Sequence, residues 1–283
     1  MASLKEVKGR IASVNNTRKI TSAMKMVASA KLHKAQAAIE NMLPYERRLN
    51  HILTNFLSAD SEVESPFIVK REVKRVAIVV FASNTSLCGG FNANIIRHLT
   101  VILDEYKSLG MENVLLYPVG RKELGFKAEG DFQHMADKPS YQEAAALAED
   151  LMRRFLHRDI DKVELLYNHF RSTAVQVLTR ETYLPIDLTQ EKKEEDKGRI
   201  PDYIVELSVD VVMGELLPKV LRMKMFTVLL DSNASEHAAR TMAMQIATDN
   251  ANDLLQDLTV MYNKSRQQAI TNELLDIVGG SMA

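Results

Sequence analysis

The chain has 283 residues, of which 46% are hydrophobic, and a formal net charge of −1, a composition that supports a folded core and excludes a largely disordered chain. The longest uninterrupted apolar run, residues 76–82, is far shorter than the roughly 20 residues of a membrane-spanning helix, and no signal-like stretch precedes it. Cys88 is the only cysteine, which excludes a disulfide within the chain.

The first segment, residues 1–60, predicts one long helix. It contains no glycine after Gly9, and Pro44 is its only proline, where we expect a local kink. Apolar residues recur in it at steps of three or four, a period typical of a helix that packs along another helix over many turns. This apolar seam comprises Ala28, Leu32, Ala35, Ile39, Met42, Tyr45, Leu49, Ile52 and Phe56.

The same segment is strongly basic. Residues 1–57 hold ten Lys or Arg against three Glu, so the rest of the chain is acidic overall. A basic start of this kind is also typical of a mitochondrial transit peptide. Lys outnumbers Arg here and the helical period continues far beyond the usual leader, which favours a part of the mature protein.

The middle segment, residues 61–204, predicts a compact α/β domain. Its first strand lies within residues 74–83, which are rich in β-branched side chains. The further predicted elements are a helix over 92–108, a strand over 114–119, a helix over 140–157 and two strands over 162–170 and 173–184. Because strands alternate with helices, we expect a largely parallel sheet. Residues 189–199 contain no apolar side chain and predict a solvated loop.

The last segment, residues 205–283, predicts a second long helix with a bend near Pro218. Its apolar or small positions include Ala243, Ala247, Ala251, Leu254, Leu258, Met261, Leu274 and Ile277. The two helices would extend on the order of 80 and 105 Å, which is too long for the middle domain to cover. We therefore predict an α/β fold in which a long antiparallel coiled coil of N- and C-terminal helices joins a Rossmann-like α/β domain.

The loop SNTSLCGGFN, residues 83–92, resembles a phosphate-binding turn between a strand and a helix. The common phosphate loops need a Lys or three spaced glycines, and this loop has neither. Cys88 has no base that the sequence places beside it, and no pair of histidines or cysteines has metal-ligand spacing. The loop is therefore interpreted as a tight turn, and the sequence predicts no catalytic, cofactor or metal site.

A basic helix is also compatible with nucleic-acid binding, because Lys and Arg on one face displace phosphate counterions. No aromatic side chains interleave with these charges and no known reading motif accompanies them. A solvated face, or a face turned toward acidic protein loops, explains the same charges.

Two stretches decide between these alternatives. ITSAMKMVASAKLHKAQ in the first helix, and SEHAARTMAMQIATDNA followed by NKSRQQAITNELLDIVGG in the last, closely resemble the gamma subunits of F-type ATP synthases. The resemblance covers essentially the whole chain. It fails at residues 84–86, where Asn-Thr-Ser stands in place of the family's Asp, basic residue and Gly, so a role for those charges is not carried over.

The resemblance implies a non-catalytic central rotor that stands inside a hexamer of alpha and beta subunits and couples ion flow to ATP synthesis or hydrolysis. Its α/β domain would sit with the epsilon subunit on the membrane c-ring, at the cytoplasmic face of a bacterial inner membrane. The implied beta-subunit contacts are Met24, Lys25, Arg266, Gln267 and Thr271. The family implies no cofactor and no nucleic acid.

Overall fold

The computed structural model describes residues 3–58, 65–120, 128–186 and 209–281. These residues form two compact units, one made of residues 1–29 with 240–283 and one of residues 30–239. Helices α1 (Leu4–Ser58) and α6 (Val209–Ser281) each contribute to both units, and each continues through its internal proline. The division of the sequence into three segments remains a prediction, since compactness groups part of each long helix with the middle domain.

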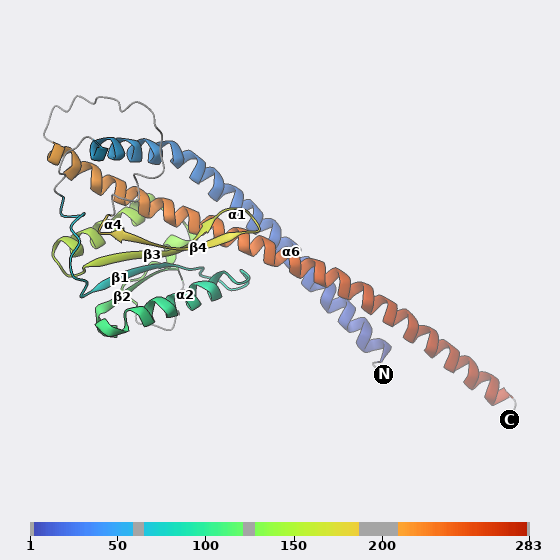
Figure 1. Ribbon diagram of the computed structural model, residues 1–283. Coiled ribbons are helices and arrows are strands. Elements are labelled where there is room, and N and C mark those ends of the chain that lie inside the picture. The colour runs from blue at the N-terminus through green and yellow to red at the C-terminus, as the bar shows by residue number, and fades with distance from the viewer. Residues whose placement is uncertain (1–2, 59–64, 121–127, 187–208, 282–283) are drawn as a thin grey trace. The chain divides into compact units, whose positions relative to one another are not determined.

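The unit of residues 30–239 is built around a four-stranded sheet of order β2-β1-β3-β4 (Figure 1). Its strands are β1 (Val76–Phe81), β2 (Val114–Val119), β3 (Lys162–Phe170) and β4 (Gln176–Leu184). Strand β1 runs parallel to both β2 and β3, whereas β4 is antiparallel to β3. The α/β class and the largely parallel sheet predicted from the alternating pattern are therefore confirmed.

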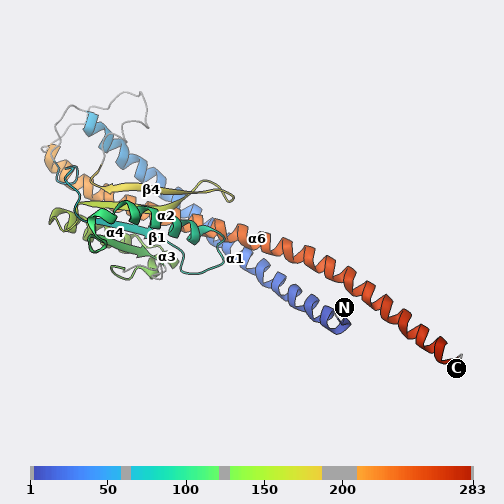
Figure 2. The ribbon, with the colours of Figure 1, turned by 60° about the horizontal axis from the view of Figure 1, so that its bottom comes forward.

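The helices of this unit cover both faces of the sheet. They are α2 (Phe91–Glu105), α3 (Gln133–Asp137) and α4 (Tyr141–Leu156), with short 3-10 turns at Lys107–Leu109 and Met111–Asn113. Helix α2 packs Ile95 and Leu99 on one face, and Figure 2 brings that side to the front. The opposite face packs α4 together with parts of α1 and α6. Both faces are apolar, as expected for parallel strands buried between helices.

Within this unit, buried or half-buried side chains of α1 follow one another at alternating steps of four and three residues. The buried positions include Leu32, Ala35, Leu49 and Leu53. The prediction that Tyr45 lies in this seam is wrong, since Tyr45 is 53% exposed. A strict period of 3.5 residues puts Glu46 at that position instead.

Glu46 is a carboxyl group placed among other charges inside the unit. Burial raises its pKa, Glu181 and Asp231 add to that rise, and Lys224 acts in the opposite direction. Apolar periodicity does not predict a carboxyl at a seam position, because the period holds while the side chain is polar.

Small residues bring α1 and α6 close together in this unit. Ala234 and Ala238 of α6 are completely buried and pack against Leu32 and Ala35 of α1. Alanine side chains leave little volume between two helix backbones, so the axes can approach. Ala234 and Ala238 therefore allow close packing of α6 against α1 in this unit.

A buried charge network lies on the α2 face of the sheet, at Glu164 of β3. The Glu164 carboxylate accepts hydrogen bonds from Arg180 Nε at 2.9 Å and Tyr106 Oη at 2.8 Å, and pairs with Lys162 Nζ at 2.7 Å. Burial raises the pKa of Glu164, but the bonds from Arg180, Lys162 and Tyr106 outweigh it, so the pKa is lowered overall. The folded state therefore stabilises the ionised carboxylate.

Replacing Glu164 by Gln is expected to lower the free energy of unfolding by about 2 to 3 kcal/mol at pH 7, because two partly buried cations, Arg180 and Lys162, lose the charge and one acceptor oxygen of their carboxylate partner. A depressed carboxyl pKa stabilises the fold above the unfolded pKa and loses that contribution as pH falls through the folded pKa. The free energy of unfolding, measured with urea, should thus decrease less between pH 7 and pH 3 in Glu164→Gln than in the parent protein. Glu105→Gln, which touches only Arg180 from an exposed position, is the control; an equal effect of both variants would contradict the network.

Candidate functional site

The unit of residues 1–29 and 240–283 consists of α1 and α6 running antiparallel, side by side in Figure 1 and Figure 2. Two contacts fix the pairing. The hydroxyls of Thr21 and Thr248 lie 2.8 Å apart, and Arg18 Nη1 donates to Asn252 Oδ1 at 3.3 Å. Residue numbers therefore increase along one helix as they decrease along the other, which confirms the antiparallel coiled coil predicted from the two long helices.

The seam between the helices keeps the period of 3.5 residues but is polar at its centre. On α6 the buried or half-buried residues that follow this period include Met244, Thr248, Ala251, Leu255, Leu258 and Tyr262. The predicted positions Leu254, Met261, Leu274 and Ile277 are exposed, so the prediction is wrong there. Leu254 and Met261 each precede a true seam residue, Leu255 and Tyr262, whose side chain is also largely apolar, so the sequence pattern does not separate them.

Polar groups within an apolar seam fix which residues face each other, since a shift of register would leave them without partners. Thr21 is buried, and its hydroxyl also contacts Arg18 O at 3.0 Å. The Thr248 hydroxyl also lies 2.7 Å from Met244 O. The apolar pattern did not predict these contacts, although the same period continued upstream of Ala28 leads to Thr21.

Replacing Thr21 and Thr248 by Val, singly and together, is expected to give a coupling free energy of about 0.5 to 1.5 kcal/mol in a double-mutant cycle, because the second change no longer breaks a hydrogen bond. Urea unfolding of the full chain measures it. Thr259→Val is the control, since that hydroxyl is exposed and bonds only Leu255 O of its own helix. Strictly additive effects would show that the pair does not hold the register.

The predicted partner-contact residues fall into two groups on this unit. Met24 and Lys25 of α1 are half-buried, close to the Thr21 contact. Arg266, Gln267 and Thr271 of α6 are exposed, and the Thr271 hydroxyl donates to Gln267 O at 2.9 Å. From the register, the two groups are separated by about 30 Å along the helix axis, at 1.5 Å per residue. The structure does not bring them together in one site.

Gln267 and Thr271 share a face of α6, being four residues apart, while Arg266 points about 100° away around the helix axis. The described residues offer the side chains of Arg266 and Gln267 no hydrogen-bond partner. A guanidinium and a carboxamide on an exposed helix can both bind oxygen acceptors of another molecule.

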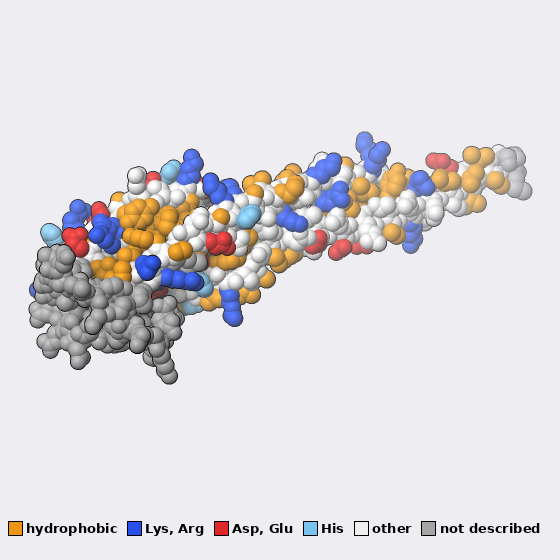
Figure 3. Space-filling view, turned by 90° about the horizontal axis from the view of Figure 1, so that it is seen from above, with side chains coloured by type: hydrophobic (Ala, Val, Ile, Leu, Met, Phe, Trp, Pro, Cys, Tyr) orange, Lys and Arg blue, Asp and Glu red, His pale blue; other side chains and the backbone are white. Residues whose placement is uncertain are grey.

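Large apolar side chains are exposed along the same unit. Those of α1 are Ile20, Met26 and Val27, and those of α6 are Ile246, Leu254, Val260, Met261, Ile270, Leu274, Leu275, Ile277 and Val278. Figure 3 shows orange apolar side chains interspersed with blue Lys and Arg, and orange predominating toward the end of α6. Exposed apolar side chains gathered in this number along one helix pair indicate a protein interface.

The loop from Ser83 to Gly90 links β1 to α2, and in the sequence it resembles a phosphate-binding turn. Leu87 and Gly89 adopt positive φ values of 66° and 61°, and the Ser83 amide donates to Asn92 Oδ1 at 3.0 Å. Cys88 is buried. The loop is a tight turn held by its own polar groups, in agreement with the interpretation from the sequence.

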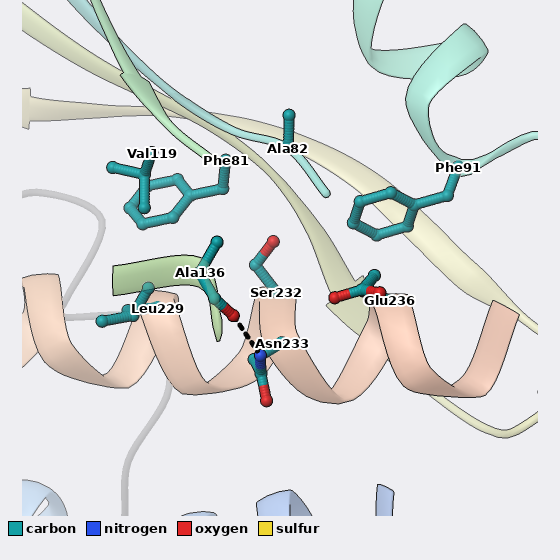
Figure 4. A pocket seen from close by; sticks show the side chains of 9 residues that line it. All are labelled: Phe81, Ala82, Phe91, Val119, Ala136, Leu229, Ser232, Asn233 and Glu236. Carbon is teal, nitrogen blue, oxygen red and sulfur yellow. Dashed lines mark hydrogen bonds between the residues drawn. The ribbon is translucent and has the colours of Figure 1, made fainter. Parts of the chain in front are cut away.

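A pocket beside this loop is lined by Phe81, Ala82 and Phe91 on one side and by Ser232 and Glu236 of α6 on the other (Figure 4). Its volume is about 10 Å³. That is room for about one water molecule, and a nucleotide cannot enter.

Two further observations concern metal binding and membrane crossing. Within the described ranges, no group of His, Cys, Asp and Glu side chains is placed to hold a metal ion. Among the described helices, none carries an apolar stretch of the length that a membrane crossing requires.

Comparison with known proteins gives consistent matches over the whole chain. A family model described as ATP synthase matches residues 3–283. The ATP synthase gamma chain of Phocaeicola vulgatus is 97% identical and that of Bacteroides fragilis 66% identical, each over the full length of both chains. A chain of the Euglena gracilis mitochondrial ATP synthase, solved with OSCP, F1 and the c-ring, has a similar fold, with a TM-score of 0.67 at 21% identity over 99% of this chain and 93% of that one.

Proposed function

Since the chain belongs to the ATP synthase gamma-chain family, we propose that it is the central rotor shaft of an F-type ATP synthase. In this role it couples ion flow through a membrane c-ring to ATP synthesis or hydrolysis in a hexamer of alpha and beta subunits. The observation that carries the proposal is the exposed apolar surface on the antiparallel α1 and α6 pair, which is the kind of surface that a surrounding sleeve of subunits would cover.

The α/β unit would join the epsilon subunit and the c-ring, and the protein would be peripheral to the cytoplasmic face of a bacterial inner membrane. Met24 and Lys25 would face beta-subunit loops, while Arg266, Gln267 and Thr271 would hydrogen-bond a beta subunit. Exposure of the α6 group supports this assignment, since those side chains are accessible to a partner. The alternative of a helical nucleic-acid-binding protein gains no support, because the family model and the relatives point to ATP synthase.

Copurification tests the assembly. A tagged chain expressed with the alpha, beta and epsilon subunits of its own complex is expected to retain them through size-exclusion chromatography in an ATP-hydrolysing particle. A chain that elutes alone while the alpha and beta subunits assemble without it would overturn the proposal.

The subunit itself is proposed to be non-catalytic, because the turn at residues 83–90 offers no phosphate-binding Lys and the adjoining pocket holds about one water. Titration calorimetry of ATP into the purified full chain is expected to show no binding at micromolar concentrations, and phosphate release should match buffer. The assembled complex is the positive control. Micromolar ATP binding by the chain alone would contradict this assignment.

A further inference from the structure

A second site lies where the amino-terminal ends of three strands meet. Val76 of β1 is paired with Val114 of β2 and Lys162 of β3, so the residues preceding each strand converge at one edge of the sheet. A shallow pocket of about 480 Å³ opens there. Its charged lining consists of Arg71, Lys74, Arg75 and Arg158 with Glu72 and Asp161, an excess of positive charge.

One acid and one cation of this lining are engaged in holding the edge together. Asp161 pairs with Arg71 Nε at 3.0 Å and accepts the amides of Lys74 at 2.9 Å and Arg75 at 3.0 Å. Arg71 Nη2 donates to Phe155 O at 2.7 Å and to Ile160 O at 2.6 Å. Arg71 and Asp161 therefore form a fixed frame, and Asp161 is not available to neutralise the remaining cations.

The other three cations of the lining are Lys74, Arg75 and Arg158, and most of their N–H donors are unused within the described residues. Among the described residues, the side chains of Lys74 and Arg158 have no partner, and Arg75 makes only a long bond from Nε to Asn113 Oδ1, at 3.4 Å. All three are exposed. Two guanidinium groups and one ammonium group in the same pocket can donate hydrogen bonds to the oxygens of a phosphate group. Arginine binds such oxygens through two parallel N–H donors.

Arg158 occupies a turn position at which glycine is usual. It follows the end of α4 with φ of 63°, and the next amide, of Asp159, donates back to Arg154 O at 2.9 Å. This is the helix-ending turn in which glycine is favoured, because a left-handed conformation is strained for a residue with a Cβ. An arginine is therefore held at a glycine position, with its side chain in the basic pocket.

We propose that this pocket binds a phosphate-bearing ligand, held by Lys74, Arg75 and Arg158. The recognised chemistry is a phosphate mono- or diester anion, which a free phosphate compound and a phospholipid headgroup both present. The site is remote in sequence from the partner-contact residues of the helix pair, and the inference does not depend on the rotor role.

The test uses the purified full chain and two probes. Titration calorimetry with inorganic pyrophosphate measures binding of free phosphate compounds, and cosedimentation with vesicles of phosphatidylcholine, with or without phosphatidylglycerol, measures headgroup binding. We expect saturable binding in at least one arm, weakened by salt. Pyrophosphate binding without vesicle binding assigns the site to soluble ligands, and the reverse result assigns it to headgroups.

Arg158→Gly is the decisive variant, because glycine relieves the strained backbone while it removes the guanidinium. Affinity is expected to fall at least about ten-fold, as when a charge-assisted hydrogen bond is lost, with an unchanged or raised melting temperature. Lys74→Gln should have a similar effect, and Arg97→Ala, at an exposed arginine of α2, should have none. No binding in either arm, full affinity in Arg158→Gly, or an equal loss in Arg97→Ala would each overturn the proposal.

Discussion

Replacement of both Arg266 and Gln267 by alanine is expected to lower steady-state ATP hydrolysis by the reconstituted complex about ten-fold or more, with a parallel loss of ATP-driven ion pumping. Both side chains are exposed on α6 and have no partner within the described residues, so their donors are available to a beta subunit. Hydrogen bonds involving a charged group contribute about 1.5 to 3 kcal/mol. A bond of that strength favours one rotor orientation by about ten- to 150-fold and can still break at each step.

The control for this prediction is the pair Lys264→Ala with Gln268→Ala. It removes another cation and another carboxamide from exposed positions on the same turns, and both lie about 160° around the helix axis from Arg266, at about 100° per residue. Assembly should be intact in both double variants, because the seam of α1 and α6 does not involve these side chains. Unchanged hydrolysis in the Arg266 and Gln267 variant would remove the two residues from the mechanism, and failed assembly would assign them a structural role.

Gly120→Ala is expected to destabilise the α/β unit by about 4 kcal/mol or more, which is enough to prevent folding of many domains. Gly120 follows β2 with φ of 113°, and a Cβ there would lie 2.0 Å from the backbone oxygen of Ala82. That contact cannot be relieved by a side-chain rotation. It would force apart the ends of β1 and β2, where the Ala82 amide donates to Val119 O at 2.9 Å.

Gly110→Ala is the matched control, because Gly110 also has a positive φ, of 84°, but its Cβ would approach nothing closer than Glu112 Oε1, at 3.6 Å. Backbone strain alone should then cost about 1 to 3 kcal/mol. The stability of the two variants is measured by soluble yield and by urea unfolding followed by circular dichroism. Equal effects of the two variants would show that the close approach of Gly120 to Ala82 does not limit stability.

The sequence predicted the fold well wherever the signal was local and periodic. The strand expected over 162–170 is β3 without any shift, and the helix expected over 140–157 is α4 within one residue at each end. Both are bounded by polar or turn residues and carry a clear apolar pattern. The antiparallel helix pair followed from length, since helices of that size cannot be covered by one domain.

The sequence predicted side-chain placement less well, because apolar character was taken as the marker of burial. Tyr45, Leu254 and Met261 are apolar or amphipathic but exposed, whereas Glu46 and Thr21 are polar and lie in the seam. The basic pocket was not predicted at all. Its residues come from segments more than 80 positions apart, and only the parallel pairing of β1 with β2 and β3 brings them together.

The unequal extent of the two helices has a mechanical consequence. Two rods that cannot slide along each other resist bending and twisting far more than one rod, and the Thr21 to Thr248 and Arg18 to Asn252 bonds oppose such sliding. Helix α1 begins at Leu4, opposite about Ser265, and every described side chain from Thr271 to Val278 is exposed. Stiffness therefore drops near Arg266, so under an applied torque the elastic strain concentrates in the last turns of α6.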